Sequence, residues 1–198
     1  MIGDSVIYLA KEYHIDGFRF DLMALHDIDT MEKIRKELYN INPTLLIYGE
    51  GWTAEDSPLK EADRASKMHV DRFTYKTQDE AKDEVLPIAV FNDNIRDAIK
   101  GNTFIAEDKG FVSGALNKAG DIKLGVKAQI KDNPGDLSTY NKWAEEPYQC
   151  VNYAASHDNY TLWDKLLLSN DITNPNMLDD SSSNNEIKII KINKITAA

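Results

Sequence analysis

The sequence predicts an α/β fold that forms part of an eightfold parallel barrel, a (β/α)8 TIM barrel. Short apolar strands alternate with helical patterns along the 198 residues, and polar or charged residues follow directly on several of these strands. The first two strands and the helix between them span about the 30 residues of a βαβ unit, which favours parallel pairing. Four such strand and helix repeats make half of a barrel that typically takes about 250 residues.

The first half of the chain supplies the clearest elements. Apolar residues recur at helical spacing from the start of the chain to Tyr13, without a preceding cap, so we expect the chain to begin inside a longer domain. A strand over residues 17–22 follows. Asp29, with Glu32 three residues later, predicts the start of a helix that ends at residues 42–43, and residues 45–48 form the next strand.

The second half is less regular. The polar segment 53–84 predicts a loop and a surface helix over the barrel mouth. A third strand at 88–91 leads into a helix at 92–100 that Gly101 ends. Residues 102–149 are rich in turns, with a helix near 122–130. A fourth strand at 150–155 precedes a helix through Leu162 and Leu166; 181–185 reads as a low-complexity loop, and 187–195 favours a helix.

Composition limits the classes of function. The formal net charge of −10, with no compact basic patch, argues against binding to nucleic acid or to an anionic membrane. No apolar run approaches the roughly 20 residues that span a bilayer, so we expect a soluble protein with a neutral partner. The compartment is left open. Cys150, the single cysteine, reads as a buried free thiol.

The stretch 15–23 (IDGFRFDLM) has one apolar and one charged face, because side chains alternate along a strand. Arg19 and Asp21 share the charged face, which suits the inside of a barrel near its loop-bearing end. Glu50 and the pair His157 and Asp158 also fall near strand ends. Each has a structural alternative, as a helix cap, a solvated loop residue or a hydrogen-bonded histidine, but their occurrence at successive strand ends indicates an active site.

Paired carboxylates are the groups that retaining cleavage of a glycosidic bond requires, about 5–5.5 Å apart. Neighbouring strands, about 4.8 Å apart, can provide that separation. Arg19 should keep Asp21 ionised as the nucleophile, whereas an aromatic setting should leave a proton on Glu50 as the acid/base. His157 and Asp158 are candidates to form hydrogen bonds with sugar hydroxyls.

Aromatic residues near the strand ends are candidate sugar platforms. Trp52, just past the second strand, is the one that we expect to face substrate, whereas Tyr153 and Trp163 favour core packing. The polar run 92–94 is as consistent with a helix cap as with a site, and the charged run 79–84 reads as a solvated face. We expect neither a metal nor a cofactor.

Three motifs, GFRFDLM, YGEGW and VNYAASHDN, resemble successive conserved regions of the α-amylase-type glycoside hydrolases. Together with FNDNIRDAIKG, the amino-acid sequences of these motifs are similar to those of type I pullulanases, and the resemblance covers most of residues 2–176. The resemblance implies strands 4 to 7 of one catalytic barrel domain covering 1–198. It also implies a monomeric enzyme that cleaves α-1,6 bonds in pullulan, starch or glycogen with retention.

The resemblance implies that Asp21 is the nucleophile, Glu50 the acid/base and Asp158 the transition-state stabiliser. Arg19, His157, Trp52 and Asn159 then make up the substrate-binding set. The family's first conserved region and several strands are absent from the sequence, and residues 62–84 look longer than the family pattern. We therefore expect this 198-residue chain to be inactive alone.

Three alternatives are left open. One is another amylase-type specificity, for isoamylase-like or α-1,4 substrates. Another is a Mg²⁺-dependent barrel enzyme for proton abstraction, which Arg19 beside Asp21 disfavours because a cation there competes with the metal. The third is a non-catalytic glucan-binding subunit, which would not need the three carboxylates that this chain keeps.

Overall fold

The structure is a computed structural model that describes residues 1–172 apart from 55, 74, 77–84 and 87. It divides into two compact units, the first made of residues 1–91 and 127–151 and the second of residues 92–126 and 152 onward. The loop predicted at 181–185 and the helix predicted at 187–195 lie outside the described residues. That all of 1–198 belongs to one barrel domain stays a prediction.

A four-stranded sheet organises the first unit. Its order is β1 (Gly17–Phe20), β2 (Leu46–Gly49), β5 (Ala89–Asn92) and β6 (Cys150–Asn152), and the last residues of β5 and β6 begin the second unit. β1 pairs parallel with β2, and β2 with β5. A parallel sheet with accompanying helices confirms the α/β prediction and fits part of a (β/α)8 barrel.

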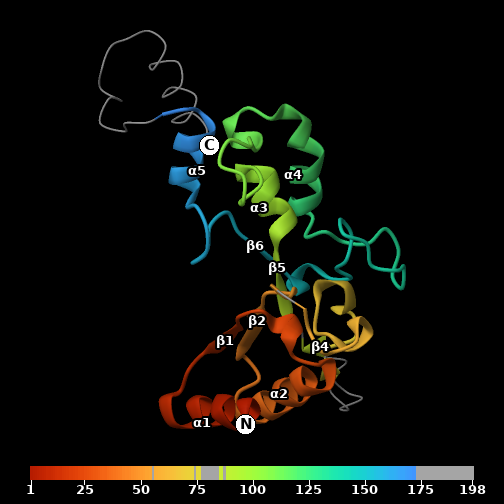
Figure 1. Ribbon diagram of the computed structural model, residues 1–198. Coiled ribbons are helices and arrows are strands. Elements are labelled where there is room, and N and C mark those ends of the chain that lie inside the picture. Colours follow the sequence, from red (N-terminus) through yellow and green to blue (C-terminus); the bar gives the residue numbers. More distant parts are fainter. Residues whose placement is uncertain (55, 74, 77–84, 87, 173–198) are drawn as a thin grey trace. The chain divides into compact units, whose positions relative to one another are not determined.

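Two helices pack together beside the first strands, α1 (Ile2–Tyr13) and α2 (Ile28–Ile41) (Figure 1). The bounds of α1 confirm the predicted helix. The predicted start of α2 was wrong by two residues: Asp27, not Asp29, is the N-cap, because its Oδ1 accepts a 2.8 Å hydrogen bond from the Thr30 backbone N–H. Asp29 instead lies in the first helical turn, where its negative charge suits the helix dipole.

The core of the first unit combines α1, α2 and the sheet with part of the predicted surface segment. Ala65, Val70 and Phe73 are fully buried in it, so this segment, predicted as a loop and a surface helix, also contributes to the core. This segment contains two 3-10 turns, η2 (Glu61–Asp63) and η3 (Lys67–His69). An antiparallel pair that the sequence did not predict follows, β3 (Tyr75–Lys76) with β4 (Val85–Leu86).

Residues 127–151 return to the first unit and add a second contribution to its core. Trp143 is fully buried there, and its backbone N–H donates to the Gln129 carbonyl at 2.9 Å. The backbone N–H of Lys131 donates in turn to the Ala144 carbonyl at 2.8 Å. These bonds connect the two ends of the loop before the 3-10 turn η6 (Pro147–Gln149) leads into β6. Full burial of one such large apolar side chain contributes about 1.5–3 kcal/mol.

The second unit is helical. It contains α3 (Asp93–Lys100), the 3-10 turns η4 (Phe111–Ser113) and η5 (Leu116–Lys118), α4 (Ala119–Val126) and α5 (Leu162–Ser169), and α3 packs against both α4 and α5. Asn92 caps α3 through the Ile95 N–H, which is the cap alternative left open for residues 92–94. In the described part of the chain, no helix has the length and apolar character to cross a bilayer.

Candidate active site

The register of β1 and β2 brings Asp21 and Glu50 together. Phe20 pairs with Gly49 at the ends of the two parallel strands, so the next residue on each strand is a carboxylate. The Glu50 backbone N–H extends the pairing by donating to the Phe20 carbonyl at 3.0 Å. A carboxylate oxygen of Asp21 lies within 4.8 Å of one of Glu50. The two groups are therefore close enough to act on one bond.

Arg19 bridges the two carboxylates. One terminal guanidinium nitrogen contacts Asp21 Oδ1, and the other donates to Glu50 Oε1 at 2.7 Å. The second oxygen of Glu50 accepts a 2.8 Å hydrogen bond from the Leu22 backbone N–H. The sequence predicted the contact of Arg19 with Asp21 but not its contact with Glu50. Each carboxylate oxygen of Glu50 thus accepts one hydrogen bond from within the first unit.

The two carboxylates differ in exposure. The side chain of Asp21 is 62% exposed, whereas that of Glu50 is 8% exposed. Leu22, which follows Asp21, adopts a left-handed backbone conformation (φ 42°), and this turn aims its N–H at Glu50. An accessible carboxylate beside a buried one suits the unequal roles of nucleophile and acid/base.

His157, Asp158 and Asn159 lie in the second unit, in an exposed loop. β6 ends at Asn152, so the predicted strand at 150–155 is shorter than expected, and both His157 and Asp158 come after it. His157 Nε2 lies 3.2 Å from Asp158 Oδ1. The structure thus groups Arg19, Asp21 and Glu50 in one unit and the loop residues in the other. Their convergence on one sugar unit stays a prediction.

Comparisons with known proteins agree on one family. No protein-family model matches the chain. The chain is 34% identical over 165 residues to a pullulanase of Bacillus subtilis. This match covers 83% of the chain and 20% of that pullulanase. It is 32% identical to pullulanase A of Streptococcus pneumoniae, covering 85% of the chain and 12% of that protein.

Solved structures give the same result. A pullulanase of Paenibacillus barengoltzii in complex with maltohexaose and alpha-cyclodextrin matches 96% of the chain and 25% of its own chain, with 37% identity and a TM-score of 0.75. A pullulanase from Bacillus acidopullulyticus matches 94% of the chain and 19% of its own, with 40% identity and a TM-score of 0.71. The chain belongs to the pullulanase family. It spans about a fifth to a quarter of the length of these two crystal structures.

Two glycines flank Glu50 in this pullulanase-family chain, and both are required by close contacts. A Cβ at Gly49 would lie 2.7 Å from the Phe20 carbonyl oxygen and 2.9 Å from Met23 Sδ. A Cβ at Gly51 would lie 2.7 Å from the Lys67 backbone nitrogen, which donates to the Gly51 carbonyl at 3.0 Å. The GEG motif therefore lets β1 and the 53–73 segment approach the backbone around Glu50.

Aromatic residues support Arg19 rather than Glu50. Arg19 lies over the Phe91 ring, 5.6 Å from its centroid, and Phe91 packs edge-on against Tyr48 at 5.5 Å. The sequence predicted an aromatic setting for Glu50, yet in the structure its two carboxylate oxygens accept hydrogen bonds from a guanidinium and a backbone N–H. Phe91 belongs to the predicted third strand, but its contact with Arg19 depends on a register that the sequence does not fix.

The structure changes the interpretation of the remaining aromatic and thiol residues. Trp163 is 47% exposed, so its predicted place in the core was wrong. Tyr153 is half-buried and its hydroxyl accepts from Arg96, which makes it a polar contact as well as a packing residue. Cys150 is a free cysteine as predicted but is half-buried, packed against the core of the first unit. Trp52 is half-buried, and its predicted contact with substrate stays a prediction.

Proposed function

We propose that the protein carrying this chain is a retaining glycoside hydrolase that cleaves α-1,6-glucosidic bonds in pullulan, starch or glycogen. The observation that carries the proposal is the bridge from Arg19 to both Asp21 and Glu50, which holds two carboxylates within reach of one bond. The names of the relatives and the maltooligosaccharides bound to solved pullulanases support this substrate class.

In the first step, the Asp21 carboxylate attacks the anomeric carbon while Glu50 protonates the departing glucosidic oxygen. The bond between that carbon and oxygen breaks, and a covalent bond from the carbon to Asp21 forms. In the second step, Glu50 accepts a proton from water, whose oxygen attacks the same carbon and releases Asp21. Arg19 orients the attacking carboxylate throughout, since its fork contacts Asp21 directly.

We also propose roles for the exposed loop of the second unit. His157 and Asp158, in contact with one another, are proposed to bind sugar hydroxyls and to strengthen those hydrogen bonds in the transition state. Asn159, with its left-handed backbone (φ 62°), turns the chain directly after them. Trp52 is proposed as an apolar platform beside Glu50.

The test measures reducing sugar released from pullulan by the protein expressed from its complete reading frame. Asp21→Asn is expected to lower kcat on the order of 10⁴-fold. Glu50→Gln should lose activity on pullulan but keep glycosyl-enzyme formation from an α-maltosyl fluoride, because fluoride leaves without a proton. Asp16→Asn and Glu37→Gln change exposed carboxylates of the same unit and should leave kcat unchanged.

Three experimental outcomes would contradict the proposed function. Full activity of Asp21→Asn contradicts the assigned nucleophile. Loss of activity in EDTA with recovery in Mg²⁺ would favour a metal-dependent reaction, against the position of Arg19 between the carboxylates. Binding of branched glucan without any hydrolysis would make the protein a non-catalytic glucan-binding subunit. Release of maltotriose from pullulan, with no cleavage of amylose, separates α-1,6 from α-1,4 specificity.

A further inference from the structure

The loop that carries His157 and Asp158 is exposed at every residue from Ala155 to Thr161. Burial therefore does not determine its path. Residues that act on a transition state have to be held to within a fraction of an ångström, so an exposed loop in this role needs specific anchors. The residues just before and at the end of this loop, Tyr153 and Tyr160, both have such contacts within the second unit.

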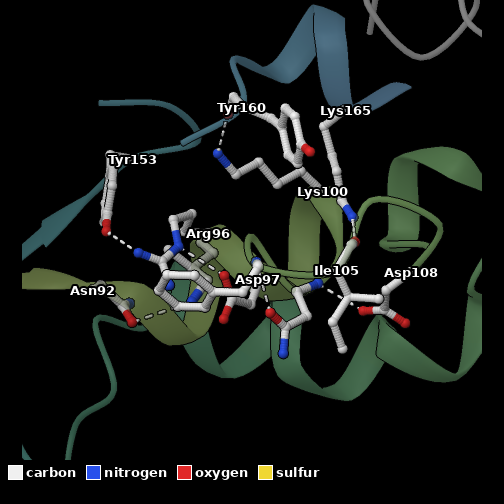
Figure 2. Close-up of polar contacts among 12 residues, drawn as sticks. Asn92, Arg96, Asp97, Lys100, Ile105, Asp108, Tyr153, Tyr160 and Lys165 are labelled. Atoms are coloured by element: carbon white, nitrogen blue, oxygen red, sulfur yellow. Dashed lines mark hydrogen bonds and ion pairs between the residues drawn. The ribbon is translucent and has the colours of Figure 1, made fainter. Parts of the chain in front are cut away.

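Both anchors come from α3. Arg96 donates from Nη1 to the Tyr153 hydroxyl at 2.9 Å and lies over the same ring, 5.7 Å from its centroid. Lys100 donates from Nζ to the Tyr160 carbonyl at 2.7 Å. Arg96 and Lys100 are four residues apart and so lie on one side of the helix, and Figure 2 shows them reaching toward the two ends of the loop segment.

The helix that carries the anchors is itself fixed. Asn92 is fully buried, caps α3 through the Ile95 N–H and donates to the Asn152 side chain at 2.8 Å. Asn152 donates in turn to the Gly125 carbonyl at 3.0 Å, and Gly125 packs against Ile95. The start of α3, the end of β6 and α4 therefore form one hydrogen-bonded and packed group within the second unit.

The charge of one anchor, Lys100, is kept in an unfavourable setting. Lys100 is 1% exposed, and burial together with the charge of Arg96 lowers its pKa. Burial also raises the pKa of Tyr153 to about 12, against the charge of Arg96, so its hydroxyl stays protonated. A buried ammonium costs several kcal/mol, and an apolar residue of the same size would often stabilise the fold as well or better. Stability alone therefore explains Lys100 poorly.

We propose that Arg96 and Lys100 are positioning residues that hold the segment between Tyr153 and Tyr160, and through it His157 and Asp158, in the geometry that the reaction requires. This inference rests on the proposed function. Neither residue is proposed to contact the reacting bond. Each acts through the loop.

A second buried lysine supplies the matched control. Lys165 is fully buried on α5, but it donates to the carbonyls of Ile105 and, at 3.1 Å, Ala106, about 50 residues before the loop. Lys100→Met and Lys165→Met make the same change at equal burial. We expect the two changes to shift the melting temperature by similar amounts, whereas only Lys100→Met should lower kcat on pullulan about 10- to 100-fold, with KM changed less than threefold.

A milder pair covers the case in which Lys100→Met does not fold. Tyr153→Phe removes only the hydroxyl that Arg96 contacts, and should lower kcat about 3- to 10-fold. Tyr160→Phe removes a hydroxyl but leaves the anchored backbone carbonyl, and should leave kcat within twofold of the parent. Equal kcat values in the two members of either folded pair would overturn the proposal.

Hydrogen exchange separates this proposal from the proposed function. Lys100→Met and Tyr153→Phe should raise amide exchange about tenfold across 154–160, whereas Lys165→Met should not. If the parent protein has no activity on pullulan but this exchange pattern holds, the proposed function fails and the anchoring stands. If the parent is active and exchange across the loop is the same in all variants, the anchoring fails and the proposed function stands.

Discussion

Arg19 donates a 2.7 Å hydrogen bond to Glu50, a residue on the neighbouring strand, while its other terminal nitrogen contacts Asp21 on its own strand. One guanidinium thus fixes the separation of the two carboxylates.

Arg19→Lys is expected to lower kcat about 10- to 100-fold while the melting temperature changes little. A single ammonium cannot reproduce the planar fork that reaches both Asp21 and Glu50 at once, so the carboxylates lose their fixed spacing. Steady-state kinetics on pullulan and a thermal melt measure the two effects. Arg72→Lys, which alters an exposed arginine bound to the Ala62 carbonyl, is the control. Parental kcat in Arg19→Lys would contradict the bridging role.

Gly49→Ala should destabilise the protein by about 1–3 kcal/mol and lower kcat as well, because its Cβ has to displace either the Phe20 carbonyl or Met23 and thereby moves Glu50. Chemical denaturation and kinetics on the folded protein measure both. Gly3→Ala on α1 is the matched change: its Cβ meets only Ile34, at an ordinary 3.7 Å, so stability should stay equal or rise. A stable and fully active Gly49→Ala protein would refute the close approach.

Gly125→Ala and Gly120→Ala, on the same helix α4, should have effects of opposite sign. A Cβ at Gly125 would lie 2.6 Å from the Ile95 side chain and would push α3 and α4 apart, costing about 1–3 kcal/mol. A Cβ at Gly120 meets nothing within 4 Å, so helix propensity should add up to about 1 kcal/mol. Equal melting temperatures for the two variants would disprove the predicted packing of α3 on α4.

Asp27→Ala should cost about 1 kcal/mol and Asp29→Ala much less, since only Asp27 accepts hydrogen bonds from the Thr30 N–H and hydroxyl. Burial works to raise the pKa of Asp27, yet the hydrogen bonds from Thr30 prevail and lower it below 3.8. Its stabilising contribution is therefore complete above pH 3.8 and is lost as the pH falls through the lower folded pKa. The difference in unfolding free energy between parent and Asp27→Ala, measured from pH 6 downward, should shrink in that acidic range. A constant difference would argue against the ionised cap.

Elements with a strong local pattern could be predicted from the sequence. The predicted helix ending at Tyr13 matches α1, because its apolar residues recur at helical spacing; the predicted strand at 17–22 starts with β1 at Gly17 but extends two residues past its end at Phe20. The N-cap was misassigned because Asp27 and Asp29 are both acceptable capping residues, and only the path of the chain into α2 decides between them. The short pair β3 and β4 has two residues per strand, too few for an alternating pattern.

The proximity of Asp21 and Glu50 could be predicted, but the specific contacts that other distant residues make could not. The bond from Arg19 to Glu50 depends on the register of β1 and β2. The burial of Lys100 depends on a carbonyl acceptor 60 residues away, and a lysine on a short polar helix gives no local sign of it. Trp163 was expected inside because it is large and aromatic, yet α5 turns Lys165 and Leu166 inward in its place.

The pairing of Phe20 with Gly49 also sets how the two carboxylates tolerate insertions. One residue added within β1 after Arg19 would turn Asp21 to the opposite side of the sheet, whereas a whole turn added to the middle of α2 would leave both strand ends where they are. Relatives of this chain should therefore accumulate length changes in the connecting helix and almost none in the two strands.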